Sequence, residues 1–297
     1  MYRDFIVIHP PRGFAYRGVR FTREFEMKRF HIIRGFAIAL CLLLITASGF
    51  VQTGEGEDFE PYSGQPGKDV VWVPTPQVLV DTMLDMAKVT SSDYVIDLGS
   101  GDGRTVITAA KRGATALGIE YNPDMVELSR RNAAREGMSA RARFERADIF
   151  ESDFSKANVI TMFLLPRINL ELRPKILDMT PGTRVASNSF DMADWKPDQT
   201  VDLKGEDCSG WCIAYLWIVP AKVNGTWKFD NGQIRFNQEF QEISGTLTMD
   251  GREQNFTGKL DGDRISFNVG GTEYTGTVSG DTISGARAGG GYWRATR

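Results

Sequence analysis

The sequence predicts an α/β fold, in which helices cover both faces of a parallel sheet, followed by a small antiparallel β domain. Between residues 94 and 189, short apolar runs alternate with longer helix-like segments, which is typical of a parallel sheet. From Ala221 onward, Gly, Thr and Ser dominate, and turn dipeptides such as Asp250-Gly251 separate short alternating runs. With 297 residues, the chain is long enough for both domains.

Basic residues precede a long uncharged run, Gly35–Gly54, near the start of the chain. Read from Met27, the basic residues, the apolar block and the small residues at its end are typical of a secretory signal peptide. We therefore expect residues 1–26 to be a non-native extension from an over-extended reading frame, and residues 27–50 to be the signal peptide. The alternative is an uncleaved membrane anchor, with membrane association through residues 35–50.

Both interpretations of this segment predict that the globular part is exported or membrane-anchored, outside the cytoplasm. The cysteines allow either redox state, because Cys41 lies in the apolar block and Cys208 and Cys212 bracket a predicted turn. A small disulfide would form there in an oxidising compartment, and two free thiols are the equal alternative. No histidine follows His31, so no metal site is expected and histidine-dependent nucleophilic catalysis is excluded in the mature protein.

Residues 51–68 are rich in Gly, Glu, Ser and Pro and predict a linker to an α/β domain that spans residues 69–220. The domain begins with an extended segment, W-V-P-T-P at 72–76, because its two prolines end any strand there. An amphipathic helix follows at residues 78–87, and Thr75 could cap it.

The first predicted strand ends in an acid and a glycine-rich loop, in the run Y-V-I-D-L-G-S-G-D-G-R at 94–104. Gly99, Gly101 and Gly103 stand at alternate positions, and residues 105–112 predict a helix. Such a junction lets a ligand lie against bare backbone, near the exposed amides of a helix N-terminus. The acid-first order differs from the G-x-G-x-x-G pattern of dinucleotide-binding dehydrogenases, so that class is less favoured.

Two further predicted strands, 116–120 and 142–148, also end in acids and are separated by a helix at 123–137. Glu120 stands where nucleoside-binding folds place the acid that accepts hydrogen bonds from ribose hydroxyls. The carboxyl ends of parallel strands meet at one edge of a sheet, where ligands bind in open α/β folds. These strand ends therefore predict a nucleoside-binding crevice.

The rest of the sheet is predicted from a strand at 158–166 that ends in L-L-P, a strand at 183–189, and an antiparallel closing hairpin of 199–207 and 211–220. Asp191, Asp194 and Trp195 follow the 183–189 strand and form a candidate substrate-facing cluster. An equal alternative is a surface turn that the indole anchors.

Together these motifs resemble the class I S-adenosylmethionine-dependent methyltransferases over about residues 69–220. The resemblance implies a Rossmann-like, seven-stranded methyltransferase sheet with helices on both faces, and S-adenosylmethionine as cofactor. Glu120 would hold the ribose, Asp148 the adenine, and the segment before the first strand would fold over the cofactor. The residues that this resemblance implies in cofactor binding are Thr75, Asp97, Gly99, Ser100, Gly101, Gly103, Glu120 and Asp148.

The W-V-P-T-P segment, the glycine loop, the L-L-P strand end and a late D-W-x-P resemble one group in particular. They are similar to the membrane-anchored lysine methyltransferases that modify the ATP synthase c subunit, and to their bacterial relatives. This resemblance implies N-methylation of a protein lysine, with a protein or small-molecule methyl acceptor. Asp191 or Asp194 would then accept or orient the amine proton, and Trp195 would pack on the ammonium stem.

Residues 221–297, which that group lacks, predict an open barrel or a sandwich of short antiparallel strands. Its acids are explained by turns, with calcium binding as the minor alternative. The net charge of −3 gives no reason to expect a nucleic-acid partner. Because S-adenosylmethionine is made inside the cell, the rival hypothesis is an exported, non-catalytic binding protein on a methyltransferase scaffold, acting through its β domain.

Overall fold

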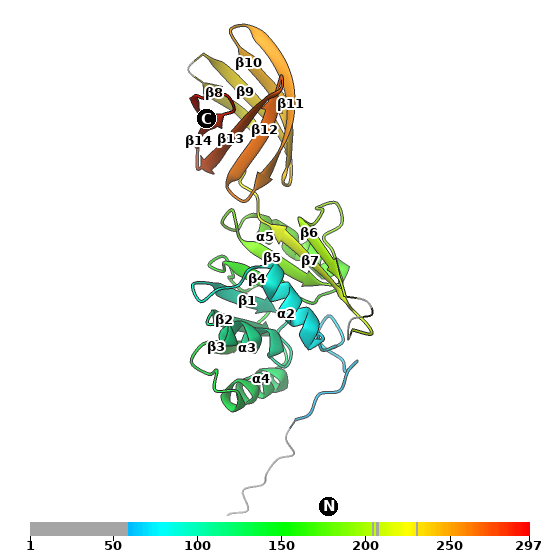
Figure 1. Ribbon diagram of the computed structural model, residues 1–297. Helices are drawn as coiled ribbons and strands as arrows, with labels where there is room; N and C mark the ends of the chain where they lie inside the picture. The colour runs from blue at the N-terminus through cyan, green and yellow to red at the C-terminus, as the bar shows by residue number, and fades with distance from the viewer. Residues whose placement is uncertain (1–58, 204, 206–207, 230) are drawn as a thin grey trace, which may run out of the picture. The chain divides into compact units, whose positions relative to one another are not determined.

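The computed structural model describes residues 59–297 except 204, 206–207 and 230 (Figure 1). The predictions of an N-terminal extension at 1–26 and of a signal peptide or anchor at 27–50 lie outside the described residues. The same is true of the first part of the predicted linker. In the part of the chain that is described, no helix is both long enough and apolar enough to span a bilayer.

Seven strands form one mixed sheet in the order β3-β2-β1-β4-β5-β7-β6 (Figure 1). Strands β1 to β5 are parallel, whereas β7 is antiparallel to β5 and β6. The chain leaves β1 toward β2 and β3 and then returns to place β4 on the other side of β1. Ligands bind at such a switch point, outside the carboxyl ends of the strands. The strands are β1 (Tyr94–Leu98), β2 (Thr115–Glu120), β3 (Ala142–Arg146), β4 (Val159–Met162), β5 (Arg184–Asn188), β6 (Gln199–Asp202) and β7 (Ile213–Ile218).

Helices cover both faces of this sheet, which explains why its central strands are apolar at successive positions. Successive strand residues point to opposite faces, so Val95 packs in one core cluster and Ile96 in the other. The first cluster contains the buried sides of α2 (Gln77–Met86), α3 (Arg104–Lys111) and α4 (Pro123–Arg135), and the second contains that of α5 (Pro166–Leu177). The predicted α/β fold with helices on both faces is therefore confirmed.

The C-terminal strands form a closed barrel in the order β10-β11-β12-β13-β14-β15-β8-β9, where an open barrel or a sandwich was expected. Hairpin turns join neighbours, as at Asp250 and Gly251, whose φ angles of +50° and +72° match the Asp-Gly signal. Aromatic rings such as Trp227, Phe236 and Phe267 fill the interior, so the barrel is a packed core. The strands are β8 (Gly225–Phe229), β9 (Gly232–Glu239), β10 (Glu242–Met249), β11 (Arg252–Asp261), β12 (Arg264–Val269), β13 (Thr272–Ser279), β14 (Thr282–Arg287) and β15 (Tyr292–Thr296).

Candidate active site

A cavity of about 540 Å³ opens at the carboxyl edge of the seven-stranded sheet. Its walls come mainly from the loops that follow strands β1 to β5, from the extended segment 65–75, which precedes α2, and from the loop between β6 and β7. The residues predicted for cofactor binding line this cavity, except Gly103: they are Thr75, Asp97, Gly99, Ser100, Gly101, Glu120 and Asp148. Folding thus brings three strand ends and the extended segment to one crevice.

The loop after β1 follows a backbone path that only glycine adopts without strain. Gly99, Gly101 and Gly103 have φ angles of +78°, +54° and +83°. A Cβ at Gly101 would lie 2.5 Å from Nε1 of Trp72 in the extended segment. A Cβ at Gly103 would lie 2.7 Å from the ring of Phe144 on β3. Gly101 therefore makes room in the cavity wall, whereas Gly103 lets the loop pack against the sheet.

Glu120, at the end of β2, is held by two backbone amides. Its Oε2 accepts a hydrogen bond from the N–H of Gly101 at 3.0 Å, and its Oε1 accepts one from the N–H of Asn122 at 2.9 Å. The side chain is half-buried and lines the cavity. Since a carboxylate oxygen can accept more than one hydrogen bond, this oriented carboxylate can still accept from the hydroxyls of a ligand.

Asp148, after β3, contacts a lysine of the extended segment. Its carboxylate accepts a hydrogen bond from the N–H of Phe150 at 3.0 Å and forms an ion pair with Lys68. The Lys68 contact is the main reason why the pKa of Asp148 lies below its ordinary value, and it also raises the pKa of Lys68. The ammonium lies 4.7 Å from the ring centroid of Tyr121. A cation and an aromatic ring thus flank the acid that was predicted to contact adenine.

Asp97 is buried beneath the glycine loop and faces Thr161, its register partner on β4. The Thr161 hydroxyl donates a hydrogen bond of 2.6 Å to its Oδ1. Burial nevertheless raises the pKa of Asp97 to about 7, and the negative charges of Glu120 and Asp102 add to this effect. The pKa of Asp97, which lines the cavity, is therefore shifted toward neutral pH.

Two buried polar atoms near this edge of the sheet have no hydrogen-bond partner in the part of the chain that is described. Among the described residues, the buried Oγ of Ser100 and Oδ1 of Asn188 have no hydrogen-bond partner, which is rare in folded proteins. The Asn188 amide nitrogen donates to Oγ1 of Thr75 at 3.2 Å. Helix α2 has no side-chain cap, so capping is not what Thr75 does here. The Ser100 hydroxyl lies against β2, where a Cβ at Gly118 would be 2.5 Å from its Oγ, so the glycine at 118 makes room for it.

The structure corrects the predicted substrate-facing cluster. None of Asp191, Asp194 and Trp195 lines the cavity. The Asp191 carboxylate accepts a hydrogen bond from the N–H of Ala193 at 3.0 Å, and Asp194 forms an ion pair with Arg173. These two acids shape a surface turn.

Trp195 is fully buried and cannot contact an incoming substrate. Its Nε1 donates to Oε1 of Gln241 at 2.9 Å, and its ring stacks on Phe240, with a centroid distance of 5.9 Å. Trp195 therefore anchors the turn that carries Asp194, as in the alternative interpretation of this segment.

Aromatic rings form the cavity wall on the β4 and β5 side. Phe163 follows β4, Phe190 follows β5, and Trp211 lies between β6 and β7. Their ring centroids are 6.0 Å apart for Phe163 and Phe190, 5.8 Å for Phe163 and Trp211, and 5.3 Å for Phe190 and Trp211. We call these three residues the aromatic wall.

Sequence reasoning missed the aromatic wall as well as Lys68, Trp72 and Tyr121. Two of these carried a local signal, because Trp72 lies in the W-V-P-T-P segment and Tyr121 directly follows Glu120. Trp211 could have been noticed as an aromatic residue between two closely spaced cysteines.

The switch-point crevice, the glycine loop and the acids at three strand ends define the class of S-adenosylmethionine-dependent methyltransferases. The family model described as the ANTKMT methyltransferase domain matches residues 97–199. A protein-lysine N-methyltransferase of Saccharolobus islandicus (strain REY15A) is 40% identical over 153 residues, which are 50% of this chain and 94% of that protein. The ATP synthase c-subunit lysine N-methyltransferase of Xenopus laevis is 30% identical over 174 residues, which are 58% of this chain and 69% of that protein.

The chain therefore belongs to the family of protein-lysine N-methyltransferases. It is an S-adenosylmethionine-dependent enzyme, as its motifs predicted, and the rival hypothesis of a non-catalytic scaffold is not supported. Among solved structures, an RNA methyltransferase from Salinibacter ruber in complex with S-adenosyl-L-homocysteine is similar at 45% identity and a TM-score of 0.48. That match covers 51% of this chain and 96% of the other.

Proposed function

We propose that this enzyme methylates the side-chain nitrogen (Nζ) of a lysine that enters the cavity past the aromatic wall. The observation that best supports this proposal is that the cavity has two chemically different sides. Backbone amides and the acids Glu120 and Asp148 line the β1–β3 side, whereas the rings of the aromatic wall line the β4–β5 side. The first side suits a nucleoside, and the second suits an aliphatic chain.

On the nucleoside side, we assign Gly99 and Gly101 to the close approach of the cofactor's amino-acid portion. Glu120 would hold the ribose and Asp148 the adenine amino group. Lys68 would have to share Asp148 with the adenine or move away from it. When bound, S-adenosylmethionine supplies an electrophilic methyl group on a sulfonium centre.

On the acceptor side, the enzyme has to place a lysine nitrogen in line with the carbon–sulfur bond that breaks. The lysine ammonium would first lose a proton to solvent; the neutral amine would then take the methyl group, with the carbon–sulfur bonding electrons staying on the cofactor's sulfur. Holding the nitrogen close and aligned can supply much of the rate enhancement for such a displacement. The aromatic wall supports this role because rigid rings restrict the path of the side chain.

The test is methyl transfer by the full-length protein from tritiated S-adenosylmethionine to poly-L-lysine and to a total protein extract, followed by mass spectrometry of the labelled peptides. We expect label on the side-chain nitrogen (Nζ) of lysine residues. A preparation of the ATP synthase c subunit tests the acceptor that the names of five relatives give. Label on RNA or only on small amines, with none on protein lysines, would contradict the proposal.

We further propose that the protein works in an oxidising compartment, as an exported or membrane-anchored chain. Cys208 and Cys212 form a disulfide in the structure, and structural disulfides persist mainly in such compartments. Intact-mass analysis of protein from its native source tests both points. A cleaved signal peptide predicts a mature N-terminus after the apolar block and no free thiol, whereas an uncleaved anchor predicts Met27 at the terminus and Cys41 as the one free thiol. A terminus at Met1 or two free thiols would argue against export.

A further inference from the structure

We propose that Phe163, Phe190 and Trp211 are the residues that bind the acceptor lysine, and that the Cys208–Cys212 disulfide is the device that positions Trp211. This inference rests on the proposed function, because it assigns the acceptor side of the same cavity. It adds a specificity-determining surface and a positioning disulfide that the cofactor site does not require.

The aromatic wall lies on the side of the cavity that the cofactor-binding groups leave free. Its rings follow β4 and β5 or lie before β7, whereas Gly99, Glu120 and Asp148 follow β1, β2 and β3. In the sheet order, β4, β5 and β7 succeed one another on one side of β1, and β2 and β3 lie on the other. A ligand that reaches both sides must therefore extend across the switch point, as a cofactor and an acceptor together would.

The chemistry of the aromatic wall fits a lysine side chain. Ring faces pack against methylene groups, and they also attract an ammonium group through their π electrons. Trp211 is 47% exposed and packs beside the two other rings, and a contiguous exposed apolar surface, unlike a single exposed side chain, is typical of a binding site. Phe163 and Phe190 are half-buried beside it, so the three rings form a continuous surface at the cavity.

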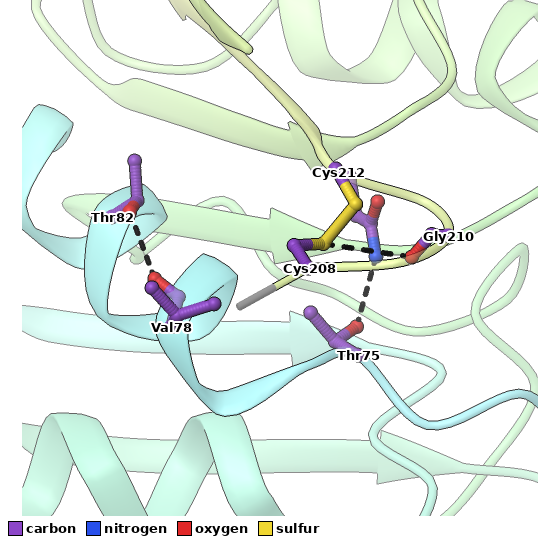
Figure 2. Close-up of a disulfide and its surroundings, with 7 residues drawn as sticks. Thr75, Val78, Thr82, Cys208, Gly210 and Cys212 are labelled. Carbon is purple, nitrogen blue, oxygen red and sulfur yellow. Dashed lines mark hydrogen bonds between the residues drawn. A yellow bond between two sulfur atoms is a disulfide. The ribbon is translucent and has the colours of Figure 1, made fainter. Parts of the chain in front are cut away.

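The disulfide joins a residue before Trp211 in the sequence to the residue that directly follows it. Cys208 and Cys212 are 93% buried, since each has 7% exposure, and they pack in the same core cluster as α2. Figure 2 shows the bond beside Val78 and Thr82 of this helix and near Thr75. The cystine thus turns toward the core while the adjoining Trp211 lines the cavity.

The backbone of Trp211 also needs such a restraint. Its φ angle is +59°, in the left-handed region that non-glycine residues adopt at a cost of about 1–2 kcal/mol. In an open loop, the residue could leave this conformation and the indole could rotate into solvent. The five-residue ring closed by the disulfide, Cys208–Cys212, removes most of that freedom.

The experiment uses the full-length protein with poly-L-lysine as acceptor probe, and measures the KM for poly-L-lysine separately from the Kd for S-adenosylhomocysteine. We expect Trp211→Ala to raise the acceptor KM about tenfold, which corresponds to the loss of one favourable ring contact. Trp211→Phe should recover most of the affinity because it keeps a ring. The Kd for S-adenosylhomocysteine should stay within about twofold in both variants, as a tenfold change would mean 1.4 kcal/mol.

The disulfide is tested by the double substitution of Cys208→Ala and Cys212→Ala, which removes the bond and keeps both positions apolar. We expect its acceptor KM to rise as in Trp211→Ala, and its Kd for S-adenosylhomocysteine to stay unchanged. Combining it with Trp211→Ala should add little, because the disulfide acts on the acceptor only through the Trp211 ring, which Trp211→Ala already removes. Tyr292→Ala is the matched control, because this barrel tyrosine is 96% exposed and lies outside the cavity.

The outcomes separate the two proposals. If the wild-type protein binds S-adenosylhomocysteine but methylates no lysine in any acceptor, the proposed function fails and the inference fails with it. If the wild-type protein methylates poly-L-lysine and Trp211→Ala leaves the acceptor KM unchanged, the inference alone is overturned. An equal loss of cofactor affinity in Trp211→Ala and the cysteine variant would also overturn it, since the effect would then be general damage to the fold.

Discussion

Replacing Gly101 by alanine tests whether the glycine loop forms the cofactor site. The added Cβ would lie 2.5 Å from Nε1 and 3.0 Å from Cδ1 of Trp72, closer than real Cβ contacts, so the indole or the loop must move. In addition, φ at Gly101 is +54°, where an alanine costs about 1–2 kcal/mol. Both Gly101 and Trp72 line the cavity, so the displacement acts directly on the site.

A matched control separates backbone strain from the clash. Gly137, just after α4, has a similar φ of +69°, and a Cβ there would meet nothing within 4 Å. Gly137→Ala should therefore carry the backbone cost alone, about 1–2 kcal/mol of folding stability. Gly101→Ala should lose at least as much stability and also weaken cofactor binding by about tenfold or more, which is at least 1.4 kcal/mol of binding energy.

The assays are isothermal titration calorimetry with S-adenosylhomocysteine and denaturant unfolding of the same preparations. We expect both variants to unfold at lower denaturant concentrations than the wild type, Gly101→Ala at the same or a lower one than Gly137→Ala, with a loss of cofactor affinity in Gly101→Ala only. Unchanged affinity in Gly101→Ala would refute the view that the loop backbone contacts the ligand. Equal affinity losses in both variants would show that the effect comes from global destabilisation.

Three other perturbations follow from the site. Burial raises the pKa of Asp97 to about 7, so between about pH 4 and pH 7 the folded state binds more protons than the unfolded state. The free energy of unfolding should therefore fall as pH rises through this range, by at most about 1.4 kcal/mol per pH unit. Asp97→Asn should flatten this pH dependence, which urea unfolding at each pH measures. Lys68→Met should free Asp148 for the adenine and so tighten the binding of S-adenosylhomocysteine. In calorimetry, the affinity of this variant should also depend less on salt concentration. Weaker binding would show that Lys68 itself holds the cofactor. Trp195→Phe should lower the free energy of unfolding by about 1–3 kcal/mol, because Oε1 of Gln241 loses its hydrogen-bond donor. The acceptor KM should stay unchanged. A raised KM would indicate that Trp195 takes part in substrate binding.

The sequence by itself predicted those parts of the protein that depend on local patterns. Each of these patterns, such as strand periodicity, alternate glycines or an acid at a strand end, spans only a few residues of sequence. The carboxyl ends of parallel strands also necessarily lie at one edge of the sheet. This is why the parallel arrangement of the strands was enough to place Glu120 and Asp148 at the same edge of the sheet as Gly101. The Asp-Gly turns of the C-terminal domain were equally local.

The tertiary structure decided what depends on contacts between distant segments. Lys68 pairs with Asp148 across 80 positions, and the rings of Phe163, Phe190 and Trp211 meet only because β4, β5 and β7 are neighbours in the sheet. Trp195 was predicted to face a substrate because its sequence neighbourhood resembles a site, yet its indole is buried against Gln241 of another domain. Local sequence sets the conformation of a residue, whereas the side chains that surround it are set by packing, which no short pattern records.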